Sequence, residues 1–279
     1  MSNTAFSRRR FLATAALALP LGTMAKAGEL SRALTPQQRQ QLVFERRRAA
    51  AQTELNNAPP LPATNGDEER ARARKLALVE RICRESVHIA GTPGQLYLYK
   101  RGIDIALVPD CGGLRWHPKC PWGDGATGCI IGRYSDTLTG EPRGIWRRPI
   151  NGDNPRALGP VGGCVVRLWP DDEVTTSLVI GEGVETVLAA SLRITRRGTL
   201  LQPAWAAGCA DGMRSFPVLA GIETLTLLVD NDANGIGQEA AAECSRRWTA
   251  AGREVVRLTP TGIGADFNDV IMGKRHERG

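Results

Sequence analysis

Residues 178–185 read LVIGEGVE, and residues 227–232 read LLVDND. Each stretch is a short apolar run that ends in carboxylates, and each precedes a segment of helical character. Both therefore predict a buried strand followed by a helix. Open α/β sheets bind their ligands at the carboxyl ends of their strands. The two stretches together predict an acidic site at one edge of a parallel sheet, of a kind that holds a divalent metal against phosphate.

The chain after residue 176 alternates between strand and helix patterns. This alternation predicts a parallel sheet with right-handed crossovers and helices on its faces. The predicted strands are 178–180, 204–207, 224–229 and 254–258, and the predicted helices are 184–192, 212–216 and 237–251. The fold class is therefore α/β, with a compact parallel sheet flanked by helices.

The chain before this core is less regular. Residues 91–170 are rich in Gly, Pro and Trp, and predict a small irregular α+β subdomain with short strands at 128–134, 144–149 and 165–169. Farther upstream, an exposed helix over 37–55 and an amphipathic helix over 68–85 predict a helical amino-terminal arm.

The carboxylates are spaced in a way that suits a hard cation. Asp230 and Asp232 are two residues apart, so they project to one side if extended geometry persists, and two carboxylates on one side can share Mg²⁺. Capping of the next helix is the competing interpretation of these aspartates. Glu182 lies between Gly181 and Gly183, whose missing side chains would let a phosphate approach the backbone closely.

A strand that ends in Glu, followed by a strand that ends in Asp-x-Asp, resembles the Toprim domain of bacterial-type primases, topoisomerases and some nucleases. Further segments resemble the primase-like branch of this family, which is found in phages, plasmids and other mobile elements. The resemblance runs from about residue 88 to residue 271. The matching segments are GTP at 91–93, YLYKRGI at 97–103, LRWHP at 114–118, WAAG at 205–208 and GADFNDV at 264–270.

This resemblance implies roles for individual residues. Glu182 is the expected general acid or base, and Asp230, Asp232 and Asp266 are the expected ligands of Mg²⁺ or Mn²⁺. For Asp266, capping of a terminal helix is the alternative. Glu185 could support the site or stabilise the first turn of its helix. The supporting positions are Glu185, Gly181, Gly183, Asn268 and Asp269.

Arginines around the irregular subdomain are the expected nucleic-acid contacts. Arg147 and Arg148 flank Trp146, a combination that can stack on and neutralise a single strand, whereas a core tryptophan edged by solvated arginines is the alternative. The formal net charge of +7 suits a polyanionic partner, but it is weak support because arginine is scattered along the chain. The predicted nucleic-acid contacts are Arg101, Arg115, Arg147 and Arg148.

The function that the resemblance implies is Mg²⁺-dependent phosphoryl transfer on nucleic acid. We expect a DNA-primase-type nucleotidyltransferase that makes RNA primers on single-stranded DNA from ribonucleoside triphosphates, with a replicative helicase as a candidate partner. The alternatives are a Toprim nuclease and a non-catalytic nucleic-acid-binding module. The seven cysteines form no Cys-x-x-Cys pair and no phosphate-binding loop motif occurs, so we expect no zinc, and priming could require partner modules.

The amino terminus raises a separate question of location. Residues 7–12 read SRRRFL and precede an apolar run at 13–21, which is similar to a twin-arginine export signal and too short for a membrane anchor. We favour the cytoplasm, where templates and triphosphates are found, with twin-arginine export to the periplasm as the alternative. The predicted divisions are 1–27 signal-like segment, 28–87 helical arm and linker, 88–172 primase-like subdomain and 173–273 Toprim domain.

Overall fold

The computed structural model describes residues 45, 49, 53, 66–262 and 264–273. The chain divides into two units, residues 1–39 and 40–279, and all of the described residues lie in the second. The signal-like segment and nearly all of the predicted helix over 37–55 lie outside the described residues. Nothing in the structure therefore bears on the export prediction.

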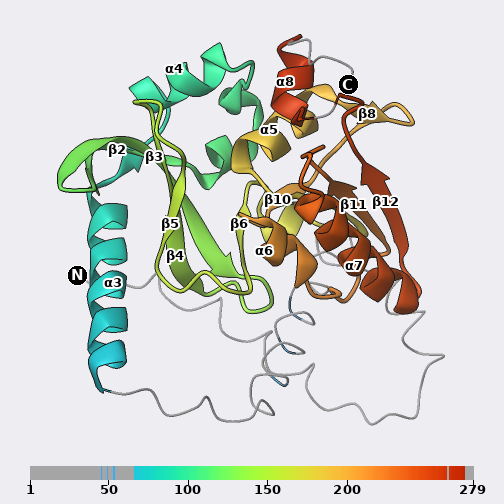
Figure 1. Ribbon diagram of the computed structural model, residues 1–279, viewed down its shortest axis with the longest axis horizontal. Helices are drawn as coiled ribbons and strands as arrows, with labels where there is room; N and C mark the ends of the chain where they lie inside the picture. Colours follow the sequence, from blue (N-terminus) through green and yellow to red (C-terminus); the bar gives the residue numbers. More distant parts are fainter. Residues whose placement is uncertain (1–44, 46–48, 50–52, 54–65, 263, 274–279) are drawn as a thin grey trace, which may run out of the picture. The chain divides into compact units, whose positions relative to one another are not determined.

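Among the described residues, ten strands form one sheet, and its main path runs β1-β2-β3-β6-β10-β7-β11-β12. The last four strands of this path are parallel to one another, which confirms the predicted parallel core. Strand β4 pairs with the free side of β3, and β5 pairs with β4. Figure 1 shows these elements in order along the chain. The sheet strands are β1 (Val87–His88), β2 (Arg115–Trp122), β3 (Gly125–Asp136), β4 (Pro142–Pro149), β5 (Arg156–Leu158), β6 (Cys164–Arg167), β7 (Ser177–Gly181), β10 (Ala204–Ala206), β11 (Thr224–Leu228) and β12 (Glu254–Leu258).

Helices cover the two faces of the parallel strands. One face carries α5 and α8, which contact each other, and the opposite face carries α6 and α7. A separate hairpin is formed by β8 (Thr195–Arg196) and β9 (Thr199–Leu200). The helices are α3 (Gly66–Glu85), α4 (Pro93–Lys100), α5 (Val184–Arg193), α6 (Ala210–Arg214), α7 (Ile236–Ala250) and α8 (Phe267–Ile271), with 3-10 turns η1 (Ile105–Leu107), η2 (Pro109–Gly113) and η3 (Asp171–Glu173).

Strand β7 is buried on both sides because it lies inside the sheet. Val179 packs in the core beneath α5, whereas Leu178 and Ile180 pack in the opposite core beneath α7. This is the period-two alternation of a strand, and here both faces are apolar because helices cover both. Burial of each such side chain contributes about 1.5–3 kcal/mol. The apolar run that ends at Glu182 therefore fixes the centre of the sheet.

The upstream part of the chain contains strands and a helix that were not predicted, among them β1, β2, β5 and α4. Helix α3 forms as predicted and packs through Val79 and Ile82 on β2, β3 and β4. Strand β2 was not predicted as a strand, and its Pro118 lies at a register shift between His117 and Cys120. Proline is tolerated at such a bulge because no ladder hydrogen bond is required there. Helix α4 was also not predicted, and it begins with a proline at its first position, where proline suits a helix.

None of the helices among the described residues is both long enough and apolar enough to cross a membrane.

Candidate active site

The site begins where two neighbouring parallel strands end. Gly181, the last residue of β7, is paired in register with Leu228, the last residue of β11. Glu182 follows the first of these and Asp230 lies just beyond the second, so both carboxylates emerge at the same edge of the sheet. The backbone carbonyl of Glu182 accepts a hydrogen bond from the N–H of Gly208, at 2.8 Å, which ties this turn to the segment after β10.

The Glu182 side chain lies against the first turn of α7. A Cβ atom placed on Gly237 would be 2.6 Å from Glu182 Oε1. This oxygen is buried and has no hydrogen-bond partner among the described residues. Burial, and then the charge of Asp232, raises the pKa of Glu182 above its ordinary value. The carboxylate is therefore partly desolvated and electrostatically uncompensated, which favours the protonated form or a bound cation.

Asp230 is the most perturbed carboxyl group of the site. Its Oδ1 is also buried without a partner among the described residues. Burial, followed by the charges of Asp266, Glu182, Asp232 and Asp269, raises the pKa of Asp230 to about 7. Four other carboxylates are thus close enough to repel its ionised form. Such a cluster is stable with all groups charged only when positive charge compensates it.

Asn231 joins the end of β11 to the loop that carries Asp266. Its side-chain Nδ2 donates to the carbonyls of Pro260, at 3.1 Å, and Gly262, at 2.9 Å. Its backbone N–H donates to Ala265, and its carbonyl accepts from Gly264. These hydrogen bonds hold the loop that carries Asp266 against the end of β11. Among the charged groups near Asp230, Asp266 raises the pKa of Asp230 the most.

Asp266 also has the capping role that was considered for it. Its Oδ1 accepts a 2.7 Å hydrogen bond from the backbone N–H of Asp269 as the N-cap of α8. Asp266 therefore stabilises a helix end and contributes negative charge to the site, and its role as a metal ligand stays a prediction.

Asp232 differs from Asp230 in its surroundings. Strand β11 ends at Leu228, so strand geometry does not by itself direct the two aspartates to one side. Asp232 is exposed while Asp230 is half-buried. Among the described residues, no three His, Cys, Asp or Glu side chains already converge on one point as a metal-ligand set.

The residues present nevertheless fit a hard divalent cation. Mg²⁺ is held by one or two carboxylates together with waters and substrate phosphates, rather than by a complete protein cage. The unpartnered oxygens of Glu182 and Asp230 are ligands of the type that it prefers. Asp230 and Asp232 would hold the ion, with Asp266 contributing charge from the adjacent loop.

The two glycines around Glu182 lie where β7 passes into α5. A Cβ on Gly181 would be 2.7 Å from Val187 of α5 and 3.1 Å from the Cβ of Leu228. Its missing side chain therefore lets β7, α5 and β11 pack closely, which is a different reason from the phosphate approach predicted for it. Gly183 is the N-cap of α5.

Glu185, one helical turn beyond Glu182, lies in a dense cluster of partners. Its Oε1 forms a 2.8 Å ion pair with Nε of Arg148, and its Oε2 forms a close ion pair with Nε of Arg101. The Tyr97 hydroxyl lies 3.4 Å from the same Oε2 and accepts a 2.8 Å hydrogen bond from Arg148. Two of the four predicted nucleic-acid contacts, Arg101 and Arg148, are thereby engaged with Glu185 and join α5 to the upstream part of the chain.

The remaining supporting residues lie around α8. Asn268 is buried, and its Nδ2 donates to the carbonyl of Arg101 at 2.8 Å. Asn268 therefore fixes α8 against the segment after α4. Asp269 is half-buried and acts on Asp230 through its charge.

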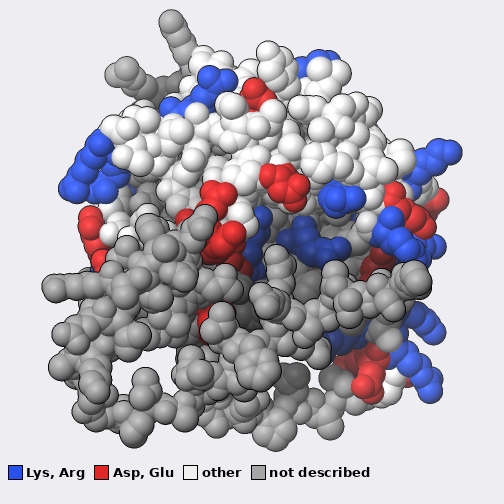
Figure 2. All heavy atoms as spheres, turned by 180° about the vertical axis from the view of Figure 1, so that it is seen from behind, with Lys and Arg blue, Asp and Glu red and all other residues white. Residues whose placement is uncertain are grey.

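Arg115 and Arg147 lie apart from the acidic edge on the upstream strands. Arg147 donates to the carbonyl of Pro121 at 2.9 Å and its guanidinium lies 5.0 Å from the ring centroid of Trp122. Trp146 is buried in the core, which favours the structural alternative for that tryptophan. Among the described residues on the face seen in Figure 2, acidic and basic side chains are interspersed, so these residues do not form one uniform basic surface there.

Two positions that shape the site were not identified from the sequence. Gly237 provides the space for the Glu182 carboxylate, and Asn231 holds the Asp266 loop. A signal exists for the first, because Gly235 and Gly237 flank the start of a helix, where two glycines are costly without a local reason. For Asn231 the only signal is its place between two aspartates.

Two separate parts of the chain match known family models. Residues 177–277 match the family model of the Toprim domain, and residues 73–168 match that of a domain of unknown function (DUF7146). No curated protein matches the chain. Among solved structures, the crystal structure of a DNA primase domain from Pseudomonas aeruginosa is similar, with 16% sequence identity, a TM-score of 0.43, and coverage of 73% of this chain and 74% of that one.

Proposed function

Residues 177–277 of this chain carry a Toprim domain, and from this premise we propose that the protein catalyses Mg²⁺-dependent phosphoryl transfer on nucleic acid. Its reaction is DNA-primase-type synthesis of RNA primers on single-stranded DNA. The primase assignment rests on the ordered upstream segments that resemble primase-like proteins, and the catalytic assignment rests on the acidic edge.

One observation carries the proposal. Glu182 and Asp230, which come from the ends of adjacent strands, each present a buried carboxylate oxygen with no partner among the described residues. A fold that needed these groups only for stability would satisfy them, because an unsatisfied buried polar group costs about 1–3 kcal/mol. Unsatisfied carboxylates with raised pKa values are typical of sites that bind a cation or move a proton.

The residues have distinct roles in this proposal. Glu182, with its raised pKa, accepts or donates a proton at the reacting oxygen. Asp230 and Asp232 bind Mg²⁺, and Asp266 adds negative charge that strengthens this binding. When bound, Mg²⁺ neutralises phosphate oxygens and orients them for in-line displacement. Gly237 leaves room for the Glu182 carboxylate, because a Cβ atom at this position would be 2.6 Å from Oε1.

The direct test is primer synthesis on single-stranded DNA with labelled ribonucleotides and Mg²⁺ or Mn²⁺. The full chain is compared with Glu182→Gln and Asp230→Asn. The matched control is Glu223→Gln, which makes the same charge change just before the other end of β11, at an exposed side chain. We expect products of several nucleotides from the wild type and the control, and a loss of about 10²–10⁴-fold in the two site variants.

The other outcomes point to the alternatives. A template that is shortened without new product, in a manner that depends on Glu182, would replace the primase assignment with a nuclease. No turnover of any kind from a folded chain would favour the non-catalytic nucleic-acid-binding module. Equal activity in wild type and both site variants would contradict the catalytic assignment altogether.

A further inference from the structure

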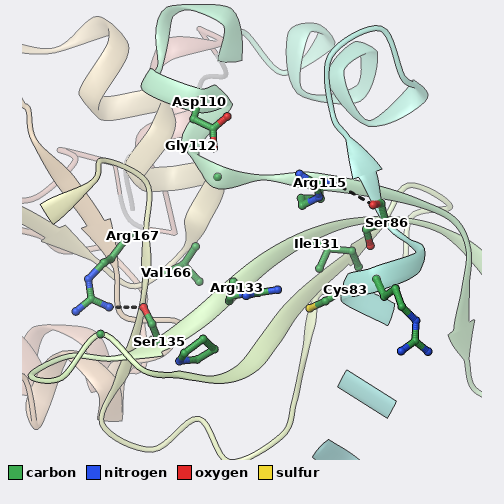
Figure 3. A pocket seen from close by; sticks show the side chains of 14 residues that line it. Cys83, Ser86, Asp110, Gly112, Arg115, Ile131, Arg133, Ser135, Val166 and Arg167 are labelled. Carbon is green, nitrogen blue, oxygen red and sulfur yellow. Dashed lines mark hydrogen bonds between the residues drawn. The ribbon is translucent and has the colours of Figure 1, made fainter. Parts of the chain in front are cut away.

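A pocket of 660 Å³ opens where β3 changes its partner. The register pairs β3 with β2 up to Ile131 and with β6 from Tyr134 onward. Between these two stretches lie Gly132 and Arg133, and the strands on that side of β3 separate. The η2 turn closes the gap from above, as Figure 3 shows. A Cβ atom placed on Gly112 would be 3.5 Å from Leu168, which follows β6.

The lining of this pocket is strongly basic. Arg115, Arg133 and Arg167 extend from three strands, β2, β3 and β6, along one face of the sheet (Figure 3). Arg84, near the end of α3, adds a fourth guanidinium. The pocket has one carboxylate, Asp110, which is exposed and lies 3.6 Å from His88. A pocket with four arginines and one acid is arranged for an anion.

Three of these arginines form no ion pair with a carboxylate among the described residues. Among the described residues, Arg84 and Arg133 have neither an ion-pair nor a hydrogen-bond partner, and Arg115 donates only to the backbone carbonyl of Ser86, at 3.3 Å. Arg167 is different, because it pairs with Asp171 at 2.9 Å and donates to backbone carbonyls. Arg167 therefore forms a wall of the pocket, and the other three are available to a ligand.

The first pocket continues into a second. This pocket, of 410 Å³, shares Cys83, Arg84, Arg133 and Pro142 with the first and extends along α3 to Leu76. It adds Glu80 and Arg143, and Arg143 is paired with Asp136 at 3.4 Å. The two pockets together form a groove, which we call the arginine groove. No Trp, Tyr or Phe side chain lines either pocket, so the described walls offer no surface on which a base would stack.

We propose that the arginine groove binds the sugar-phosphate backbone of a nucleic-acid strand through Arg84, Arg115 and Arg133. The inference deepens the proposed function, because it names the track on this chain that holds the strand. Guanidinium groups match phosphate oxygens in geometry and charge. The extended form of the groove suits successive phosphates, and the lack of aromatic walls makes the contact independent of base sequence.

Binding of a labelled strand tests this inference without turnover. The probe is a fluorescein-labelled oligothymidylate of about 16 nucleotides, followed by fluorescence anisotropy between about 50 and 200 mM salt without ribonucleotides. The full chain is compared with the double variant Arg84→Ala and Arg133→Ala. The matched control is the double variant Arg193→Ala and Arg246→Ala, which removes two exposed arginines that line neither pocket.

We expect the groove variant to bind at least about tenfold more weakly, with the slope of log K against log salt reduced by about 1.4, because each lost phosphate contact removes about 0.7. The control should retain most of the affinity. Circular dichroism and thermal unfolding should show both variants folded, since all four side chains are exposed. Unchanged affinity and slope in the groove variant would overturn the inference, as would an equal loss in the control.

Two further measurements distinguish strand binding in the groove from nucleotide binding there and from the proposed catalytic function. If fluorescent ATP loses binding in the groove variant while the oligonucleotide does not, the groove takes a free nucleotide and the inference is wrong. Glu182→Gln should bind the strand like wild type. Loss of strand binding in the groove variant, together with no synthesis by wild type, would retain the groove and reject the primase function. Unchanged strand binding in the groove variant, together with primer synthesis by the wild type, would reject the groove and retain the primase function.

Discussion

Glu182 and Glu185 occupy one turn of chain after β7, yet their environments are opposite. Glu185 is 12% exposed and is held by Arg101, Arg148 and Tyr97. Glu182 has a buried oxygen with no partner among the described residues, and its pKa is raised. The comparison separates two uses of buried carboxylates, since Glu185 joins parts of the fold and Glu182 remains available for chemistry.

The sharpest way to break this comparison is to remove the charge of Glu185. Glu185→Gln leaves the guanidiniums of Arg101 and Arg148 without their carboxylate, and we expect a loss of about 2–3 kcal/mol in the free energy of unfolding. Part of the full cost of such a loss is screened because Arg101 is 30% exposed. Urea unfolding measures the change.

Glu182→Gln is the matched comparison for Glu185→Gln, because it lies on the same turn. We expect it to preserve or raise stability, since it removes a desolvated charge. If both variants are equally destabilised, the distinction between the two glutamates fails.

The pH dependence of stability tests whether the buried carboxyls of the acidic site are uncompensated, as they are not at Glu185. The pKa of Asp230 is about 7 in the folded chain against an ordinary value of 3.8. The folded state therefore binds a proton that the unfolded state has lost between about pH 4 and 7. Stability should fall as pH rises through this window, by up to about 1.4 kcal/mol per pH unit.

Asp230→Asn should flatten this pH profile and stabilise the chain at pH 8, as measured by urea unfolding at pH 5 and pH 8. Mg²⁺ should raise the melting temperature of the wild type at pH 8 more than at pH 5, and should do so less in Asp230→Asn. Glu223→Gln serves as the control with a wild-type profile. A wild-type profile in Asp230→Asn as well would show that this carboxyl is not the group that titrates.

A smaller effect on stability is expected from the Asn231 hydrogen bonds that hold the loop before Asp266. Asn231→Ala removes the two hydrogen bonds to Pro260 and Gly262, at a cost of about 1–2 kcal/mol. Amide exchange of Gly264 and Ala265 should quicken, because both amide groups lie in the released loop. Asn234→Ala, which alters an exposed amide at the start of α7, should leave exchange in that loop unchanged. Unaltered exchange in Asn231→Ala would show that other contacts hold Asp266.

The smallest effect on stability is expected at Gly237. Gly237→Ala places a Cβ atom 2.6 Å from Glu182 Oε1, and the flexible carboxylate must move away. Helix propensity favours alanine, so unfolding should change by less than about 0.5 kcal/mol while turnover falls about tenfold. Gly162→Ala is the control, since a Cβ there meets no atom within 4 Å. Full activity in Gly237→Ala would show that the position of Glu182 is not critical.

The parallel core was predictable because its signals are local. The runs that became β7 and β11 are short, apolar and followed directly by carboxylates, and the alternation of strand and helix patterns predicts parallel pairing. The meeting of Glu182 and Asp230 follows from that pairing. Their raised pKa values do not, because burial and the approach of Asp266 depend on a loop more than 30 residues away.

The arginines show where sequence reasoning stops. Arg101 was predicted to contact nucleic acid from its charge and position, and Arg148 from its charge beside Trp146. In the structure both pair with Glu185 from a distant segment, and the nucleic-acid contact stays a prediction. Arg133 was not singled out and has no partner among the described residues. Charge at a position does not reveal whether it is neutralised, since the neutralising group is chosen by tertiary packing.

The path of the sheet has a consequence for how the chain can be divided into fragments. The two family matches meet between β6 and β7, but β10 pairs with both strands and joins the two segments edge to edge. A cut at that boundary would open the buried edges of Val165 and Val166 on one fragment and Trp205 on the other, which are templates for aggregation. We therefore expect that fragments cut between β6 and β7 aggregate when made separately and fold only when both are made together.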